Sequence, residues 1–113
     1  MFLSKQCETV KISIYVTGDE SVIRKWLQHY VMRGLCVTLS KTEYIYTYGN
    51  EDGWVVGLIN YPRYPSDYDS LLLLANEIAV GVMEETATGS STIVTDKETI
   101  FISRRPQDHT QEK

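Results

Sequence analysis

Hydrophobic residues change their spacing along this chain, from every second position to a helical repeat, and this change limits the folds that it can adopt. Between Val10 and Val16 the aliphatic residues occupy alternate positions, which is typical of a half-buried β-strand. From about residue 20 to Arg33 they recur with helical spacing, and Gly34 follows where a helix commonly ends. This part of the chain predicts a strand followed by an amphipathic helix.

The start of this helix has two candidate N-caps. Thr17, with Glu20 three residues later, fits a capping box, and Asp19 is the alternative. Either side chain would accept hydrogen bonds from amide groups that are free in the first turn of a helix.

Two further β-prone runs flank a glycine-rich loop in the middle of the chain. Residues 35–39 alternate as a strand, and residues 40–43 form a polar break. Residues 44–48 and 54–59 then enclose the loop from Gly49 to Gly53. A five-residue loop with two glycines between such runs predicts a β-hairpin.

The second half of the chain predicts another helix and a final pair of strands. Residues 60–65 carry two prolines and are expected to form a connector, because proline cannot donate to a central sheet ladder. Ser66 is the expected N-cap, and apolar residues recur with helical spacing from Leu71 to Val82. Residues 92–94 and 99–102 then predict a tight hairpin.

The predicted order of elements is β-α-β-β-α-β with an extra C-terminal strand. This order indicates an α+β sandwich of the ferredoxin-like kind, in which both helices cover one face of an antiparallel sheet. We expect residues 1–9 to form an N-terminal segment and residues 10–105 a single α+β domain. Residues 106–113 are expected to be a disordered tail, since from Gln107 onward they include no apolar residue.

Composition excludes several classes of protein and site. The 113 residues, 42% of them hydrophobic, suffice for one core. The two cysteines follow no secretory signal, so we expect reduced thiols in the cytoplasm. No apolar run is long enough to cross a bilayer. His29 and His109 are too few for a zinc site, and we expect neither metal nor cofactor.

The sequence shows no catalytic constellation, so we expect no enzymatic activity. No nucleophile-elbow pattern and no phosphate-binding glycine loop occurs. Glu51 and Asp52 are interpreted as turn residues, and Arg104 and Arg105 as the solvated end of a strand.

Tyrosine accounts for eight of the twelve aromatic residues. If the hairpin closes symmetrically on the Gly49–Gly53 loop, Tyr44, Tyr46, Tyr48, Trp54, Val56 and Leu58 share one face. The opposite face carries the smaller residues Ile45, Thr47, Val55, Gly57 and Ile59, and we expect the helices to pack there. Tyr15 joins the open, aromatic face if the aliphatic side of its strand lies under the helices.

Three hypotheses compete for this aromatic face. It could be the core, with the two faces reversed. It could bind a protein partner or a second copy of the chain, because tyrosine and tryptophan are enriched in interface hot spots. It could stack RNA bases, but residues 43–98 carry ten acidic and only two basic side chains, which disfavours nucleic acid.

The connector offers a separate candidate site around Arg63. This residue is one of the two basic residues in the acidic middle of the chain, and Tyr61 and Tyr64 stand close to it in sequence. It could anchor a carboxylate or phosphate of a small ligand or nucleotide. Alternatively, Arg63 pairs with nearby acidic groups while the prolines shape the connector.

Five strings resemble, in order and spacing, a family of small, mostly uncharacterised proteins of tailed bacteriophages and prophages. They run from Ser13 to Asp19, Gly34 to Thr38, Tyr44 to Thr47, Val56 to Arg63 and Ser103 to Arg105. The resemblance spans about residues 10–105 and assigns no functional residue. It implies a protein made in the cytoplasm of an infected bacterium.

The sequence therefore predicts a phage-type accessory protein that binds a protein partner or forms a homodimer through its aromatic sheet face. The alternative is a small-ligand or nucleotide-binding regulatory domain that uses Arg63 with Tyr61 and Tyr64. An RNA-binding sheet is the third hypothesis.

Overall fold

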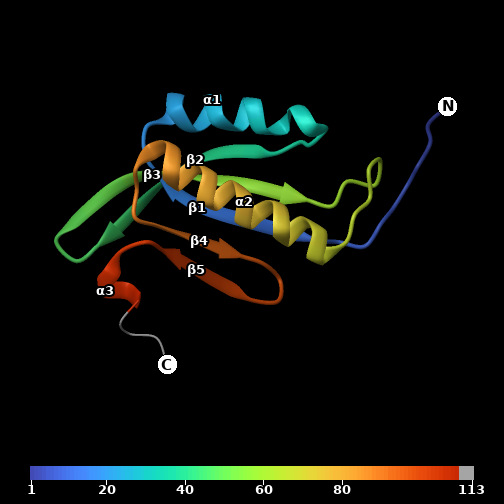
Figure 1. Cartoon of the computed structure of the whole chain (residues 1–113). Helices are drawn as coiled ribbons and strands as arrows, with labels where there is room; N and C mark the ends of the chain where they lie inside the picture. The colour runs from blue at the N-terminus through green and yellow to red at the C-terminus, as the bar shows by residue number, and fades with distance from the viewer. Residues whose placement is uncertain (110–113) are drawn as a thin grey trace.

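The computed structural model describes residues 1–109 as one five-stranded sheet with two long helices on one side (Figure 1). The strands are β1 (Lys11–Thr17), β2 (Thr38–Tyr46), β3 (Gly49–Ile59), β4 (Ser90–Val94) and β5 (Thr99–Ser103). The helices are α1 (Glu20–Tyr30), the short 3₁₀ turn η1 (Val31–Arg33), α2 (Tyr68–Thr86) and the four-residue α3 (Pro106–His109).

The sheet has the strand order β2-β3-β1-β4-β5, and every neighbouring pair is antiparallel. The first four strands with α1 and α2 form the ferredoxin-like arrangement, and β5 extends the sheet beyond β4. The predicted fold class is therefore confirmed, including the extra C-terminal strand. The opposite face of the sheet carries neither of the two long helices (Figure 1).

The core lies between the sheet and the two helices. Alternate residues of β1 are completely or almost completely buried there, because every second side chain of a strand points to the same face. The helices contribute aliphatic residues at helical spacing. The central members of this core are Ile12, Ile14, Val16, Ile23, Leu27, Val56, Leu58, Ala75, Ile78 and Val82. Full burial of each larger aliphatic side chain stabilises the fold by about 1.5–3 kcal/mol.

Aspartate caps both long helices. The Asp19 carboxylate accepts a hydrogen bond from the Val22 amide at 3.3 Å, so the second of the two candidate caps is the one formed at α1. The Asp67 carboxylate accepts from the Ser70 amide at 2.7 Å, and Asp67 therefore replaces the expected Ser66. These hydrogen bonds favour the charged carboxylate.

The β2–β3 hairpin closes differently from the prediction. Its turn is Thr47–Tyr48 rather than the loop from Gly49 to Gly53, and Tyr46 pairs with Gly49. Tyr48 adopts a left-handed conformation with φ 69°, a region that non-glycine residues rarely occupy. The expected polar break is absorbed into β2, which runs unbroken to Tyr46.

This register shift by an odd number of residues separates the tyrosines from Trp54, because each single step moves a side chain to the other face. Trp54, Val56 and Leu58 pack on the core under the helices, whereas Val55 and Gly57 share the open face with the tyrosines. The expectation that the smaller residues of β3 lie under the helices is therefore wrong. Tyr15 and Tyr44 do lie on the open face, as expected.

Of the expected C-terminal tail, Pro106–His109 form α3, and residues 110–113 lie outside the described residues. None of the described helices is long and apolar enough to span a membrane. Cys7 and Cys36 are both free thiols.

Candidate functional site

A polar cavity of about 410 Å³ opens on the face opposite α1 and α2, at the carboxyl end of β1. It forms where the β1–β4 ladder stops: the paired residues end at Tyr15 and Thr92, and the two strands continue without a ladder beyond them. We call this cavity the sheet-face hollow. It is lined by Tyr15, Val16, Thr17, Tyr44, Glu51, Thr88, Gly89, Ser90, Ser91, Thr92 and Arg105.

Tyr44 forms one wall of the hollow because a glycine beside it leaves room for its ring. A Cβ atom on Gly53 would lie 2.0 Å from Cε2 of Tyr44, so the ring lies directly over the backbone of β3. The Tyr44 hydroxyl thereby reaches β1 and donates a hydrogen bond to the Val16 carbonyl oxygen at 3.0 Å. The ring therefore spans from β2 across β3 to β1.

The surroundings of Tyr44 raise the pKa of its hydroxyl above the ordinary value of tyrosine. Burial raises the pKa of the Tyr44 hydroxyl, and the negative charges that Tyr15 and Glu51 can carry raise it further. The hydroxyl therefore stays a hydrogen-bond donor. Glu51 is exposed, and its carboxylate forms no hydrogen bond or ion pair with the residues described. It is thus available to a cation that enters the hollow.

Arg105 forms the opposite, positively charged side. It donates a hydrogen bond to the Ser90 hydroxyl and lies 3.5 Å from the Asp108 carboxylate. The side chain lies against Gly89, where a Cβ atom would approach its Nε to 2.9 Å. These contacts hold the guanidinium beside the hydroxyl group of Ser90.

The hollow can therefore bind a ligand that carries charges of both signs. Tyrosine ring faces and an unpaired carboxylate attract a cation. Arginine binds a carboxylate, and hydroxyl groups bind other hydroxyl groups. No group of three or more metal-ligating side chains occurs within residues 1–109.

The sequence-predicted binding residues are divided between several places. Tyr15 and Tyr44 line the hollow, Trp54 lies on the helix side, and Tyr46 and Tyr48 are exposed outside the cavity. Sequence reasoning assigned no binding role to Glu51 or Arg105, because the wrong hairpin register placed Glu51 in a loop. A register that pairs Tyr44 with Glu51 brings these two side chains together on the open face.

The other predicted residues line a second cavity, of about 630 Å³, beside the connector. We call it the connector pocket. Tyr61, Arg63 and Tyr64 contribute to it, and the Arg63 guanidinium lies 5.5 Å from the centre of the Tyr64 ring. The connector pocket shares no lining residue with the sheet-face hollow.

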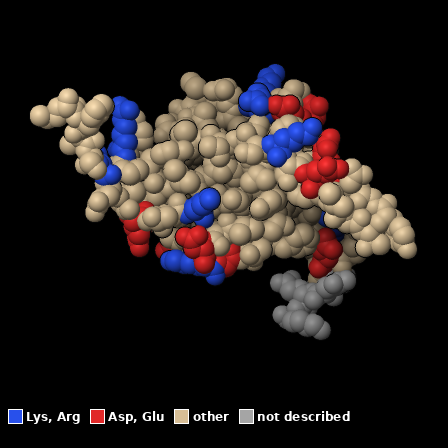
Figure 2. Space-filling model, turned by 180° about the vertical axis from the view of Figure 1, so that it is seen from behind, with Lys and Arg blue, Asp and Glu red and all other residues tan. Residues whose placement is uncertain are grey.

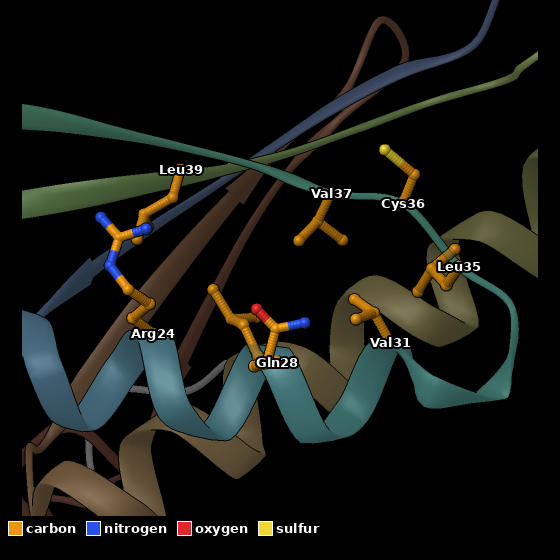
Figure 3. A pocket seen from close by; sticks show the side chains of 8 residues that line it. Arg24, Gln28, Val31, Leu35, Cys36, Val37 and Leu39 are labelled. Atoms are coloured by element: carbon orange, nitrogen blue, oxygen red, sulfur yellow. The ribbon is translucent and has the colours of Figure 1, made fainter.

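A third, smaller cavity of about 330 Å³ lies between α1 and the chain that leads into β2. Figure 3 shows Arg24, Gln28 and Val31 on the helical side of this groove, facing Leu39 and Val37, while the Cys36 thiol points away. Arg24 also pairs with Glu20 at 2.6 Å.

Charged side chains are distributed unevenly over the molecule as seen from behind. Figure 2 shows a centre of mainly uncharged residues, with basic and acidic residues mixed around the rim. A continuous basic track, which binding to a nucleic-acid backbone requires, is not visible on this side.

Comparisons with known proteins find two solved structures with this fold. A solved structure described as a phage SAM lyase in the apo state matches with a TM-score of 0.74 at 10% sequence identity, over 93% of this chain and 98% of that chain. A phage SAM lyase in complex with S-methyl-5′-thioadenosine matches with a TM-score of 0.66 at 9% identity, over 91% and 95% of the two chains. No family model and no curated protein sequence matches this chain.

These matches correct the functional prediction from the sequence. An accessory protein that binds a protein partner or itself was predicted, with no enzymatic activity, and both predictions are wrong. The finding that overturns them is that phage SAM lyase structures share this fold over almost their entire length. The relationship to phage proteins is supported at the level of the fold.

Proposed function

We propose that this protein binds S-adenosylmethionine in the sheet-face hollow and cleaves it as a lyase, with release of S-methyl-5′-thioadenosine. The observation that carries the proposal is the meeting of Tyr15, Tyr44 and the unpaired Glu51 on the open face of a fold that phage SAM lyases share. The bound thioadenosine in one of those enzymes supports the same class of ligand.

The charges of the hollow match those of the substrate. Its sulfonium is a cation, which the ring faces of Tyr15 and Tyr44 and the carboxylate of Glu51 would attract. The amino-acid end of the substrate carries a carboxylate, for which Arg105 supplies a planar donor group. The hydroxyl of Ser90 is placed to bond the ribose.

The proposed reaction requires the protein to bind and orient the substrate. When the bond between sulfur and the γ-carbon of the amino-acid part breaks, sulfur keeps the electron pair and becomes a neutral thioether. As that bond breaks, an oxygen of the substrate's own α-carboxylate forms the new bond to the γ-carbon, so the carbon fragment leaves as a lactone and neither water nor a cofactor is consumed. The residues of the hollow would bind and orient the reacting groups, and orientation alone lowers such barriers substantially.

Incubation of the purified protein with S-adenosylmethionine tests this proposal. We expect chromatography with mass spectrometry to detect S-methyl-5′-thioadenosine. We expect Glu51→Gln to lower kcat/KM by about tenfold or more, because it removes a charge beside the sulfonium. The matched control is Asp52→Asn, one residue along β3 and on the opposite face, which should leave the rate unchanged. Absence of both thioadenosine formation and thioadenosine binding would refute the proposal.

A further inference from the structure

The connector pocket is larger than the sheet-face hollow, and the proposed reaction does not use it. Its volume of about 630 Å³ lies within the range of small-molecule sites. Aliphatic side chains from three parts of the fold form its surface: Leu35 before β2, Ile59 at the end of β3, and Leu71 and Leu74 of α2. Ile59 remains 42% exposed there, so apolar surface is open to an occupant.

Arg63 supplies the single formal charge among the residues that line this pocket. Within residues 1–109 its guanidinium forms no hydrogen bond or ion pair, and it lies 5.5 Å from the centre of the Tyr64 ring. The alternative of an Arg63 paired with nearby acidic groups therefore does not describe the structure. An unpaired guanidinium beside exposed apolar surface is complementary to an anion with an apolar body.

The wall that carries Arg63 is fixed before any ligand binds. Asn60 is buried, and its side-chain amide donates to the Glu8 carbonyl oxygen at 2.7 Å and accepts from the Ser66 amide at 2.8 Å. The Tyr64 amide donates to the Tyr61 carbonyl oxygen at 2.9 Å, which closes a tight turn around Arg63.

A contact with the β2 side fixes the same wall further. The Tyr61 hydroxyl lies 3.5 Å from the Cys36 sulfur and is the donor of that hydrogen bond. A wall that is already ordered loses less conformational entropy when a ligand binds, and this favours ligand binding in the pocket.

We propose that the connector pocket is a second binding site, for a small carboxylic acid with an aromatic or aliphatic body. The apolar part would cover Ile59, Leu71 and Leu74, and the carboxylate would bind the Arg63 guanidinium. No carboxylate lines the pocket to compete for Arg63. This site is independent of the sheet-face hollow and of the proposed lyase activity.

Binding of naphthylacetate and of its neutral analogue naphthylacetamide to the full chain tests this inference. We expect the acid to shift the NMR amide signals around Arg63 and Leu74, and to bind about tenfold or more tightly than the amide. Arg63→Gln should reduce the affinity for the acid to that for the amide. Arg24→Gln changes an arginine of the third cavity, between α1 and the chain that leads into β2, and should leave both affinities unchanged.

Three results would overturn the inference. They are equal affinities of the two probes for the unchanged protein, an unaltered affinity of Arg63→Gln for the acid, and shifts confined to residues outside the pocket. Arg63 is exposed, so its replacement should not unfold the protein, and a thermal melt of the variant checks this. Shifts at Tyr44 and Glu51 report on the sheet-face hollow separately, so the two proposals can fail independently.

Discussion

At the scale of single residues, the candidate site depends on the absence of a side chain. Gly53 is buried, and the Tyr44 ring fills the place that a Cβ atom there would take. The tyrosine can therefore cross β3 and donate to the Val16 carbonyl oxygen. The glycine is used for close packing here, and not for a turn as its sequence neighbourhood suggests.

We predict that Gly53→Ala displaces the Tyr44 ring and lowers the free energy of unfolding by roughly 1–3 kcal/mol, the usual cost of overpacking. The same substitution in a Tyr44→Ala background should cost much less, because the ring that the new methyl group meets is gone. Urea denaturation of the four proteins measures the difference. An equal cost in both backgrounds would show that the two residues are not in contact.

At the scale of elements, the helices begin where aspartate accepts amide hydrogen bonds. At Asp67 the backbone and side-chain hydrogen bonds with Ser70 lower the pKa of the carboxyl below its ordinary value of 3.8. A group with a lowered pKa stabilises the folded state above its unfolded pKa, and this stabilisation disappears as the pH falls through the folded pKa.

We predict that Asp67→Ala lowers the melting temperature at neutral pH, because it removes the N-cap of α2. The difference from the unchanged protein should shrink as the pH falls below 3.8. Ser66→Ala is the control: its amide, which bonds Asn60, is retained, so the melting temperature should stay nearly constant. A pH-independent deficit in Asp67→Ala, or an equal loss in Ser66→Ala, would contradict this account of the cap.

Most elements could be predicted from the sequence because their hydrophobic spacing is regular. The hairpin register could not, because it depends on Tyr48 in a left-handed turn, where sequence favours glycine or asparagine. The loop was predicted between Gly49 and Gly53 because glycine is common in turns, but both residues belong to β3. Because of the same error, Glu51 was not predicted as a site residue. Its position opposite Tyr44 follows only from the true register. Arg105 was considered as an anion ligand, but its position beside β1 could not be predicted, because no local pattern connects it to that strand.

At the scale of the whole molecule, the two faces of the sheet have different roles. Helices α1 and α2 cover one face of the sheet and bury the core, so the open face with Tyr15 and Tyr44 is not covered by them (Figure 1). The sequence interpretation treated that free face as a protein interface. The end of the β1–β4 ladder instead forms a polar hollow on it, and the matching folds are lyases. Our central claim is that this hollow holds the adenosyl ligand.

A crystal structure of the protein with S-methyl-5′-thioadenosine tests this claim most directly. We predict that the ligand occupies the sheet-face hollow, with its sulfur against Tyr15 or Tyr44 beside Glu51, and its ribose hydroxyl groups within hydrogen-bond distance of Ser90. A ligand bound in the connector pocket or against the helices, with the hollow empty, would contradict the claim.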